Sequence, residues 1–438
     1  MNKISYIAIS VVTATLILAS HVATATKIRE PFFTDPNLKA EVIAKGLKSP
    51  TSMAFLATGD ILVAEKNGTL QRIVNGVKLP QPLIDLNVLS KTDNQGFLGV
   101  AVLKNKNTSQ ASLDKQLKSV YLYYTAYGKQ DESDIKANKS LHNYLYKYDF
   151  VNNTLSNPKV VLDLPGGDWH NGVKMLIDRN NLIYLIVGDG KAKNLAQERN
   201  QALNYQGNNS VYPDGRGGIL RIDQDGKAIG SHGILGDKDP LNKYYAYGIR
   251  NSFGMDFDPV TGKLWDTENG PTFGDEINLV EPGFNSGSNK VDGLWTVTGE
   301  RNKEKPGAVV EEPSNLVSFN GKGKYSSPEL TWRKTAGPTA LKFLSTDKLG
   351  KQYENDMLTT DVVTGRIYHF ELNHNRTGLL LNGPLADKVA DNYDELDDVV
   401  FARGFGLISD LEIGPDGYLY VVALNDGKIY RVVPGHAN

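Results

Sequence analysis

The most regular feature of the chain is a pair of apolar runs separated by a short polar turn. Within each pair, runs of Leu, Ile, Val, Tyr or Phe flank a turn rich in Gly, Asp or Asn, which is typical of a β-hairpin. The pairs lie at residues 51–65, 173–187, 254–266 and 409–422, with weaker copies at 97–125 and 339–370. Helical periodicity is weak throughout. Six hairpin units spaced by tens of residues predict an all-β fold, most simply a six-bladed β-propeller.

The competing all-β interpretation is a pair of stacked β-sandwiches, which would not require the same unit to recur six times. In a propeller, the loops at one end of the blades converge on a central channel. We therefore expect the functional residues to lie in the segments between the repeats.

The first 25 residues have the features of an export signal. Lys3 provides a positive charge, residues 4–19 are almost wholly apolar, and Ala23-Thr24-Ala25 fits a small-residue cleavage site. The sequence predicts a signal peptide over 1–25 and a single propeller domain over 26–438. An uncleaved N-terminal anchor is the alternative, and it would be the only membrane contact. In both cases the body would be secreted or extracytoplasmic, in a periplasm or at a cell surface.

Composition narrows the chemistry. The net charge is -2, which gives no basis for nucleic-acid binding. Because the sequence has no cysteine, disulfides, thiolate metal sites and cysteine nucleophiles are excluded. No P-loop, GxSxG or HExxH motif is present, so nucleotide hydrolysis, serine hydrolysis and zinc proteolysis have no support.

Three loops before or after these hairpins carry candidate chemistry. His170 lies in the Gly-rich segment 166–172, where a neutral imidazole can act as a general base. Arg250 lies just before another hairpin and could pair with an anion, although a structural arginine bonding loop carbonyls is the alternative. Asp275 and Glu276 form adjacent carboxylates in a turn, which suits a hard cation such as calcium or a self-capping turn.

Read in order, these segments resemble the soluble quinoprotein glucose dehydrogenase and aldose sugar dehydrogenase family, also called glucose/sorbosone dehydrogenases. The resemblance spans roughly residues 42–433. Its most specific part is Tyr-Gly-Ile-Arg-Asn at 247–251 followed by Gly-Pro at 270–271 and Asp-Glu-Ile-Asn at 275–278. Further matching pieces are 46–65, 95–99, 120–125, 170–172, 187–190 and 218–223.

The resemblance implies a six-bladed propeller that holds pyrroloquinoline quinone (PQQ) above a calcium ion and oxidises an aldose sugar. It implies hydride transfer from the sugar C1 to the quinone, with electrons passed to an external acceptor. His170 would be the catalytic base and Arg250 would stabilise charge on the quinone oxygen. Cofactor contacts are expected from Asn94, Gln95, Asp189, Asn251, Gly270 and Pro271. Metal ligands are expected at Gly270, Pro271, Asp275 and Glu276.

The sequence also departs from the family pattern. Val363 stands where the family has a lysine for the quinone carboxylates, and Leu407 and Ser409 replace two arginines. Arg366 and Arg403 lie nearby in sequence. Trp169 replaces an acidic residue before the base, and Ser286 replaces an aromatic residue near the calcium site.

These departures leave three functions open. The first is a PQQ- and calcium-dependent sugar dehydrogenase. The second is a non-catalytic surface propeller that binds carbohydrate or protein after its quinone site has degenerated. The third is a calcium-dependent lactonase-like hydrolase, for which Asp189, Asn251 and Glu268 are the candidate metal ligands.

Overall fold

The protein is mostly β-sheet, as the sequence predicts. The structure is a computed structural model that describes residues 30–92, 94–104, 118–128, 140–190, 213–299 and 304–435. The predicted signal or anchor at 1–25 lies outside the described residues. No helix within these ranges has the length and apolar character needed to cross a membrane.

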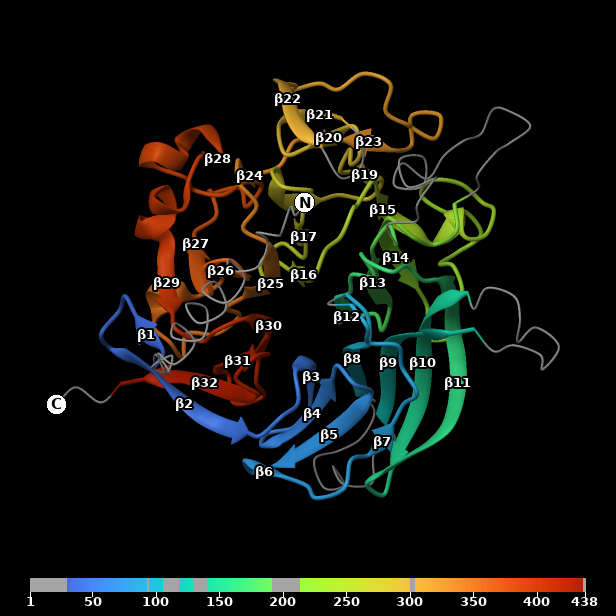
Figure 1. Cartoon of the computed structure of the whole chain (residues 1–438), viewed down its shortest axis with the longest axis vertical. Coiled ribbons are helices and arrows are strands. Elements are labelled where there is room, and N and C mark those ends of the chain that lie inside the picture. The colour runs from blue at the N-terminus through green and yellow to red at the C-terminus, as the bar shows by residue number, and fades with distance from the viewer. Residues whose placement is uncertain are drawn as a thin grey trace, which may run out of the picture.

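Within the described residues, the strands form six sheets of four to six strands and a seventh of three. The large sheets stand around a common centre, which is the arrangement of a β-propeller (Figure 1). In stacked sandwiches each sheet would instead pack against a single partner sheet.

The large sheets are numbered first to sixth in chain order. Within each sheet, the strands are given from the centre of the molecule outward. The first sheet comprises β3 (Pro50–Ala57), β4 (Asp60–Glu65), β5 (Thr69–Val74), β6 (Val77–Lys78) and β7 (Ile84–Asp85). The second comprises β8 (Phe97–Lys104), β9 (Lys118–Tyr127), β10 (Leu141–Val151) and β11 (Thr154–Pro165). The third comprises β12 (Met175–Ile177), β13 (Ile183–Val187), β14 (Gly218–Ile222), β15 (Tyr244–Tyr247), β19 (Phe284–Asn285) and β23 (Lys324–Tyr325).

The remaining sheets complete the circle. The fourth comprises β16 (Gly254–Phe257), β17 (Leu264–Glu268), β18 (Asp275–Val280), β24 (Leu330–Trp332) and β28 (Val389–Ala390). The fifth comprises β25 (Pro338–Phe343), β26 (Met357–Asp361), β27 (Arg366–Phe370), β29 (Val400–Arg403) and β1 (Phe32–Phe33). The sixth comprises β30 (Ile408–Ile413), β31 (Leu419–Ala423), β32 (Lys428–Pro434) and β2 (Leu38–Lys45).

Shorter elements decorate this frame. The small seventh sheet comprises β20 (Val291–Asp292), β21 (Trp295–Thr298) and β22 (Lys305–Val309). The described 3-10 helices are η3 (Leu241–Lys243), η4 (Lys351–Tyr353), η5 (Gly383–Asp387) and η6 (Tyr393–Val399).

The six hairpins expected from the sequence pattern are all present, and each supplies the first two strands of one large sheet. They are β3–β4, β8–β9, β12–β13, β16–β17, β25–β26 and β30–β31. The turn between β3 and β4 requires Gly59, which has φ +72°, a left-handed value that glycine adopts without a steric penalty.

Hydrophobic clusters fill the spaces between neighbouring sheets. In β4, Leu62 and Ala64 pack in a cluster shared with the second sheet, whereas Ile61 and Val63 pack in one shared with the sixth. Both faces of such a strand are buried, which explains why these segments read as continuous apolar runs rather than alternating ones. Burial on both faces makes each large sheet depend on its two neighbours.

The sixth sheet joins the two ends of the described chain. Its outer strand β2 pairs antiparallel with β32, in a register that runs from Leu38 opposite Pro434 to Lys45 opposite Lys428. Main-chain hydrogen bonds therefore join an early strand of the described chain to its last strand within one sheet.

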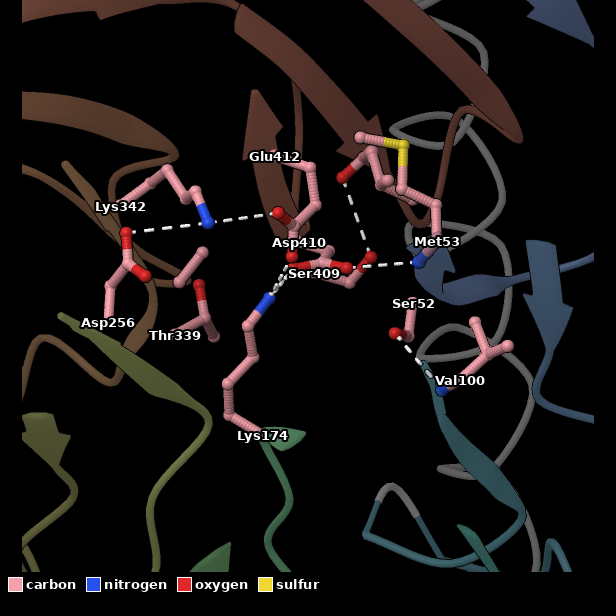
Figure 2. A network of polar contacts seen from close by, with 12 residues as sticks. Ser52, Met53, Val100, Lys174, Asp256, Thr339, Lys342, Ser409, Asp410 and Glu412 are labelled. Atoms are coloured by element: carbon pink, nitrogen blue, oxygen red, sulfur yellow. Dashed lines mark hydrogen bonds and ion pairs between the residues drawn. The ribbon is translucent and has the colours of Figure 1, made fainter. Parts of the chain in front are cut away.

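Buried ion pairs join the innermost strands near the centre (Figure 2). Lys174, just before β12, places its Nζ 2.6 Å from Asp410 Oδ1 and 2.7 Å from Glu412 Oε1, both on β30. Lys342 on β25 lies 3.0 Å from Glu412 Oε2 and 3.4 Å from Asp256 Oδ2 on β16. We call these five residues the central ion network.

Charge and burial oppose each other in the central ion network. Burial disfavours the ionised form of Glu412, but Lys174 and Lys342 outweigh it and hold the pKa of Glu412 at about 2. Burial raises the pKa of Asp410 above its usual range, despite the opposing charge of Lys174. Glu412, paired with two lysines, is therefore the carboxylate that the network most strongly keeps ionised.

Replacing Lys174 with Met should destabilise the protein. The substitution removes the cation that contacts both Asp410 and Glu412 and leaves buried carboxylate charge uncompensated, which costs about 3–5 kcal/mol. The measurement is the urea unfolding midpoint at neutral pH. Lys159→Met is the control, because Lys159 forms an exposed pair with Asp225. A Lys174→Met loss no larger than the control would contradict this account of the network.

Candidate active site at one end of the propeller

Two kinds of loop bring the predicted site residues to the same end of the fold. His170 follows β11 and precedes β12, and Arg250 lies between β15 and β16. Asp189 follows β13 and Gly270 follows β17, so both leave the second strand of a sheet. Because neighbouring strands in each sheet are antiparallel, a loop entering the first strand and a loop leaving the second emerge at the same end.

His170 and Asp189 form a buried dyad. The His170 Nδ1 lies 2.7 Å from Asp189 Oδ1, and the two residues are 8% and 3% exposed. His170 has φ +53°, and its carbonyl accepts from the Gly190 N–H at 3.0 Å. A Cβ at Gly188 would lie 2.2 Å from that carbonyl oxygen, so only glycine fits there. The Asp189 carboxylate fixes the orientation of the His170 imidazole through its contact with Nδ1.

Asn171, to which the sequence analysis gave no role, anchors the loop that carries His170. Its Nδ2 donates to the carbonyls of Asn94 and Gly167, both at 2.9 Å. Its Oδ1 accepts from Gly167 N at 2.9 Å and from Asn143 Nδ2 at 3.0 Å. Asn171 is fully buried, with 0% exposure. The sequence signals for it were its position directly after the candidate base and its place in the family-like piece at 170–172.

Arg250 and Asn251 connect the His170 dyad to the next loop. The Arg250 carbonyl accepts from Asp189 N at 2.9 Å, and its NH1 donates to the carbonyls of Asn269 and Gly270, both at 2.9 Å. Asn251 Nδ2 donates to Asn94 Oδ1 at 3.1 Å. Arg250 therefore bonds loop carbonyls, as its structural interpretation expects. One of these carbonyls, that of Gly270, is also a predicted calcium ligand.

The predicted cofactor contacts fall into one hydrogen-bonded group. Asn94 Oδ1 also accepts from the His170 N–H at 3.3 Å. Gln95 is buried, and its Nε2 donates to the Gly167 carbonyl at 3.2 Å. Pro271 directly follows Gly270 and is half-buried. Asn251 Oδ1 and Gln95 Oε1 are buried acceptors with no hydrogen-bond partner among the described residues.

Asp275 ties the neighbouring loops together. Its carboxylate accepts from the N–H groups of Gly270 at 2.7 Å, Ala336 at 2.6 Å and Gly337 at 2.7 Å. Thr335 Oγ1 donates to it as well, at 2.9 Å. Burial raises the pKa of Asp275, and these donors work in the opposite direction. Both carboxylate oxygens of Asp275 therefore accept hydrogen bonds from the protein.

Glu276 faces a group of buried acids across β17 and β18. It lies directly opposite Glu268, and Asp266 lies opposite Asn278. The Asn278 Nδ2 donates to Glu276 Oε2 at 3.0 Å, and the Glu276 Oε1 accepts from Gly293 N at 2.5 Å. Neither carboxylate oxygen of Asp266 has a hydrogen-bond partner among the described residues. We call Asp266, Glu268 and Glu276 the acid cluster.

Burial shifts the titration of the acid cluster strongly. It raises the pKa of Asp266 to about 7 and that of Glu276 to about 8, and with help from the neighbouring carboxylates it raises the pKa of Glu268 well above its usual range. The described side chains form no group of three or more His, Asp or Glu residues around a single metal position. A cation here would need carbonyl or amide oxygens in addition to carboxylates.

The candidate lactonase ligands have other partners. Asp189 contacts His170, and Glu268 Oε2 accepts from Arg250 N at 3.3 Å. Asn251 contributes its Nδ2, not its oxygen, to the hydrogen bond with Asn94. Two of the three candidate ligands therefore have carboxylate oxygens engaged by the base and its neighbouring loop, and only Asn251 keeps a side-chain oxygen without a partner among the described residues.

A cavity of about 1200 Å³ lies at the same end of the fold, on the fifth and sixth sheets. Val363 and Leu407 line it, together with Arg366 and Arg403. The Arg403 guanidinium stacks 5.2 Å from the centre of the Phe32 ring, and Arg366 pairs with Asp397 at 3.0 Å. Lys342 belongs to the central ion network instead.

Comparison with known proteins supplies the family. A sequence profile described as "Glucose / Sorbosone dehydrogenase" matches residues 47–431. The chain belongs to the glucose/sorbosone dehydrogenase family. An uncharacterized protein of Synechocystis is 24% identical over 406 residues, covering 91% of this chain and 87% of the relative. The aldose sugar dehydrogenase of Escherichia coli is 23% identical over 405 residues, covering 91% and 93%.

Family membership agrees with the fold. The solved PQQ-bound form of the aldose sugar dehydrogenase of Streptomyces coelicolor superposes with a TM-score of 0.59 at 20% identity, covering 90% of this chain and 98% of that one. Relatives in this family are sugar dehydrogenases, which are oxidoreductases. The positions at which the sequence departs from the family pattern, Val363 and Leu407, are found in the wall of the cavity.

Replacing Asn171 with Ala should loosen the His170 loop. The change removes four hydrogen bonds from a fully buried side chain and leaves donors and acceptors without partners, at about 1–3 kcal/mol for each group left unpaired. Thermal unfolding and amide hydrogen exchange over residues 166–172 measure the effect.

Asn180→Ala is the matched control, since Asn180 bonds only Asp178 within its own exposed turn. Equal melting temperatures and equal exchange in the two variants would show that Asn171 does not hold the loop.

Proposed function

We propose that this protein is an exported PQQ- and calcium-dependent dehydrogenase that oxidises an aldose sugar at C1 and passes the electrons to an external acceptor. The observation that carries the proposal is the buried His170–Asp189 dyad, joined through Arg250 and Asn251 to the loop at 269–271, in a member of the glucose/sorbosone dehydrogenase family. Proton removal from a sugar hydroxyl requires such an oriented base.

We further propose that the scaffold is a six-bladed propeller closed by β2 and β32. The innermost strands contact one another in the order β3, β8, β12, β16, β25 and β30, and β30 contacts β3. A hydrophobic cluster lies between each pair of neighbouring large sheets. These two series of contacts support one blade for each large sheet and one domain over residues 26–438.

In this proposal each residue of the dyad has a distinct task. Asp189 accepts the hydrogen bond of His170 Nδ1–H and so favours the tautomer whose Nε2 is basic. His170 takes the proton of the sugar C1 hydroxyl at that nitrogen. Arg250 provides positive charge beside the loop at 269–271 and fixes the Gly270 carbonyl. Bound PQQ would accept the hydride from the sugar C1.

The residues present fit a planar tricarboxylate cofactor. The oxygens of Asn251 and Gln95 are buried acceptors with no hydrogen-bond partner among the described residues, which suits an N–H or O–H group of the cofactor or the sugar, while the carboxylates need cationic donors. In the cavity on the fifth and sixth sheets, Val362 and Val363 give apolar surface, while Arg366 and Arg403 give positive charge. We propose that Arg366 and Arg403 bind the carboxylates of the cofactor. They would take the place of the lysine and the two arginines that the family has where this chain has Val363, Leu407 and Ser409.

Calcium has two proposed positions. The carbonyls of Gly270 and Pro271 would hold one ion, which would act as a Lewis acid on the cofactor, because the Gly270 oxygen has a second lone pair beyond the one that accepts from Arg250. A separate ion would be held by Glu276, with Asp266 and Glu268 close by. Asp275, predicted as a metal ligand from the sequence, would support the ion at Gly270 and Pro271, because its carboxylate accepts from the Gly270 N–H and so fixes that loop.

One observation favours the second function, a non-catalytic surface propeller. Ser409 Oγ donates to the Pro50 carbonyl at 2.7 Å, and Leu407 presents an apolar side chain to the cavity. The wall that should be cationic for the quinone is therefore partly apolar. Direct measurement of cofactor binding separates this function from the first.

Calorimetric titration of PQQ into the purified protein with calcium present should give micromolar or tighter binding. Arg250→Ala and Arg403→Ala should each weaken it by about tenfold or more, because a hydrogen bond to a charged group is worth about 1.5–3 kcal/mol. His170→Ala should bind PQQ but oxidise no aldose.

Arg333→Ala is the control for loss of positive charge, since Arg333 pairs with the exposed Asp391. A folded wild-type protein that binds calcium but gives no heat with PQQ would rule out the dehydrogenase and leave the surface propeller.

Calcium should raise the melting temperature of the protein at neutral pH. A cation that binds only the folded state adds about 2.7 kcal/mol at one hundred times its dissociation constant. Glu276→Gln should lose most of this gain, whereas Glu281→Gln, at an exposed pair with Lys263, should keep it. An identical calcium response in wild type and Glu276→Gln would place the ion away from the acid cluster.

A further inference from the structure

Trp169 differs from every other tryptophan in the chain. The sequence contains four tryptophans. Trp265, Trp295 and Trp332 are 0%, 3% and 1% exposed, whereas Trp169 is 42% exposed. An indole that stays 42% exposed keeps part of its apolar surface accessible to a ligand, and its N–H can meet a polar partner.

The indole sits on a firmly held loop. Thr92 Oγ1 donates to the Asp168 carbonyl at 2.7 Å, directly before Trp169, and the Asn171 side chain holds Gly167 two residues away. His170, directly after it, is fixed by Asp189. The backbone on both sides of Trp169, next in sequence to the candidate base, is therefore already ordered, which lowers the entropic cost of binding a ligand against the indole.

The chemistry of the indole selects its ligand. Its flat face is apolar and uncharged, and its single N–H is the only polar group it offers. A pyranose in its chair form carries C–H bonds on its face and hydroxyls around its rim. Such a ring can lie on the indole with its apolar face covered and its rim hydroxyls directed toward His170 and the other polar residues of the mouth.

We propose that Trp169 is the platform on which the pyranose ring of the substrate stacks, so that it sets the affinity for an uncharged aldopyranose. The inference rests on the proposed function for the identity of the site. Trp169 has no group that ionises, so it acts by binding and positioning the sugar, while His170 handles the proton. Its removal should therefore change KM rather than kcat.

Tryptophan fluorescence tests the platform directly, because among the four tryptophans only Trp169 is open to a soluble quencher such as acrylamide. Titrating D-glucose and maltose into the calcium-loaded protein should protect part of the emission from acrylamide, and Trp169→Phe should abolish that change. In steady-state oxidation, Trp169→Ala should raise KM about tenfold or more with kcat within about threefold, and Trp169→Phe should restore most of the affinity.

Leu380→Ala is the matched control, because Leu380 is another exposed apolar side chain, 50% exposed, and lies away from the site loops. Oxidation of sugar without protection of Trp169, or a Trp169→Ala variant that lowers kcat at unchanged KM, would overturn the platform while leaving the dehydrogenase standing. Protection of Trp169 by sugar without any oxidation would support the platform and overturn the dehydrogenase. Neither protection nor oxidation would overturn both.

Discussion

The fold depends on how its centre is closed. Each large sheet contributes its first strand to the middle of the molecule, and polar groups there must find partners because water is largely excluded. The central ion network provides them: Lys174 reaches from the third sheet to Asp410 and Glu412 on the sixth, and Lys342 on the fifth reaches Glu412 and Asp256 on the fourth (Figure 2). Asp410 Oδ2 also accepts from Met53 N on the first sheet, at 2.9 Å. Residues from five sheets thus share one set of charges.

This closure has a direct consequence for the candidate site. Lys174 follows His170 by four residues, so the segment that leaves the base is tied to the sixth sheet at the centre of the fold. Closer to His170, Asn171 bonds Asn143 of the second sheet, and His170 itself bonds Asp189, which follows β13 of the third sheet. A base held from both directions needs little reorganisation when a substrate arrives, which is the physical condition for efficient proton transfer.

The two sides of the mouth differ in how well they match the family. The side formed by His170, Asp189, Arg250 and Asn251 is a continuous hydrogen-bonded group with polar atoms left for a ligand. The cavity on the fifth and sixth sheets, at the same end of the fold, combines apolar Val363 and Leu407 with Arg366 and Arg403. Strong local contacts therefore hold the candidate base, whereas the positive charge proposed for a polycarboxylate comes from different positions in the chain.

The sequence by itself determined the repeating unit and its number. Alternating and continuous apolar runs depend only on which strand faces are buried, so all six hairpins and the all-β class could be predicted from the pattern. It also placed His170, Arg250 and the loop at 269–271 in the segments between repeats, where the structure finds them joined. Recognition of the glucose/sorbosone dehydrogenase family from the motifs at 247–251 and 270–278 agrees with the profile match.

Only the tertiary structure decided which partners these residues have. Asp189 is nineteen residues from His170, Asp410 is far along the chain from Lys174, and Asn171 meets Asn143 across two sheets. Asp275 and Glu276 are neighbours in sequence, yet successive side chains of a strand point to opposite faces, so Asp275 ties loops together while Glu276 joins the acid cluster. Spacing along a strand fixes the face on which a side chain lies, but the residue that it meets there is set by how the sheets close around the centre.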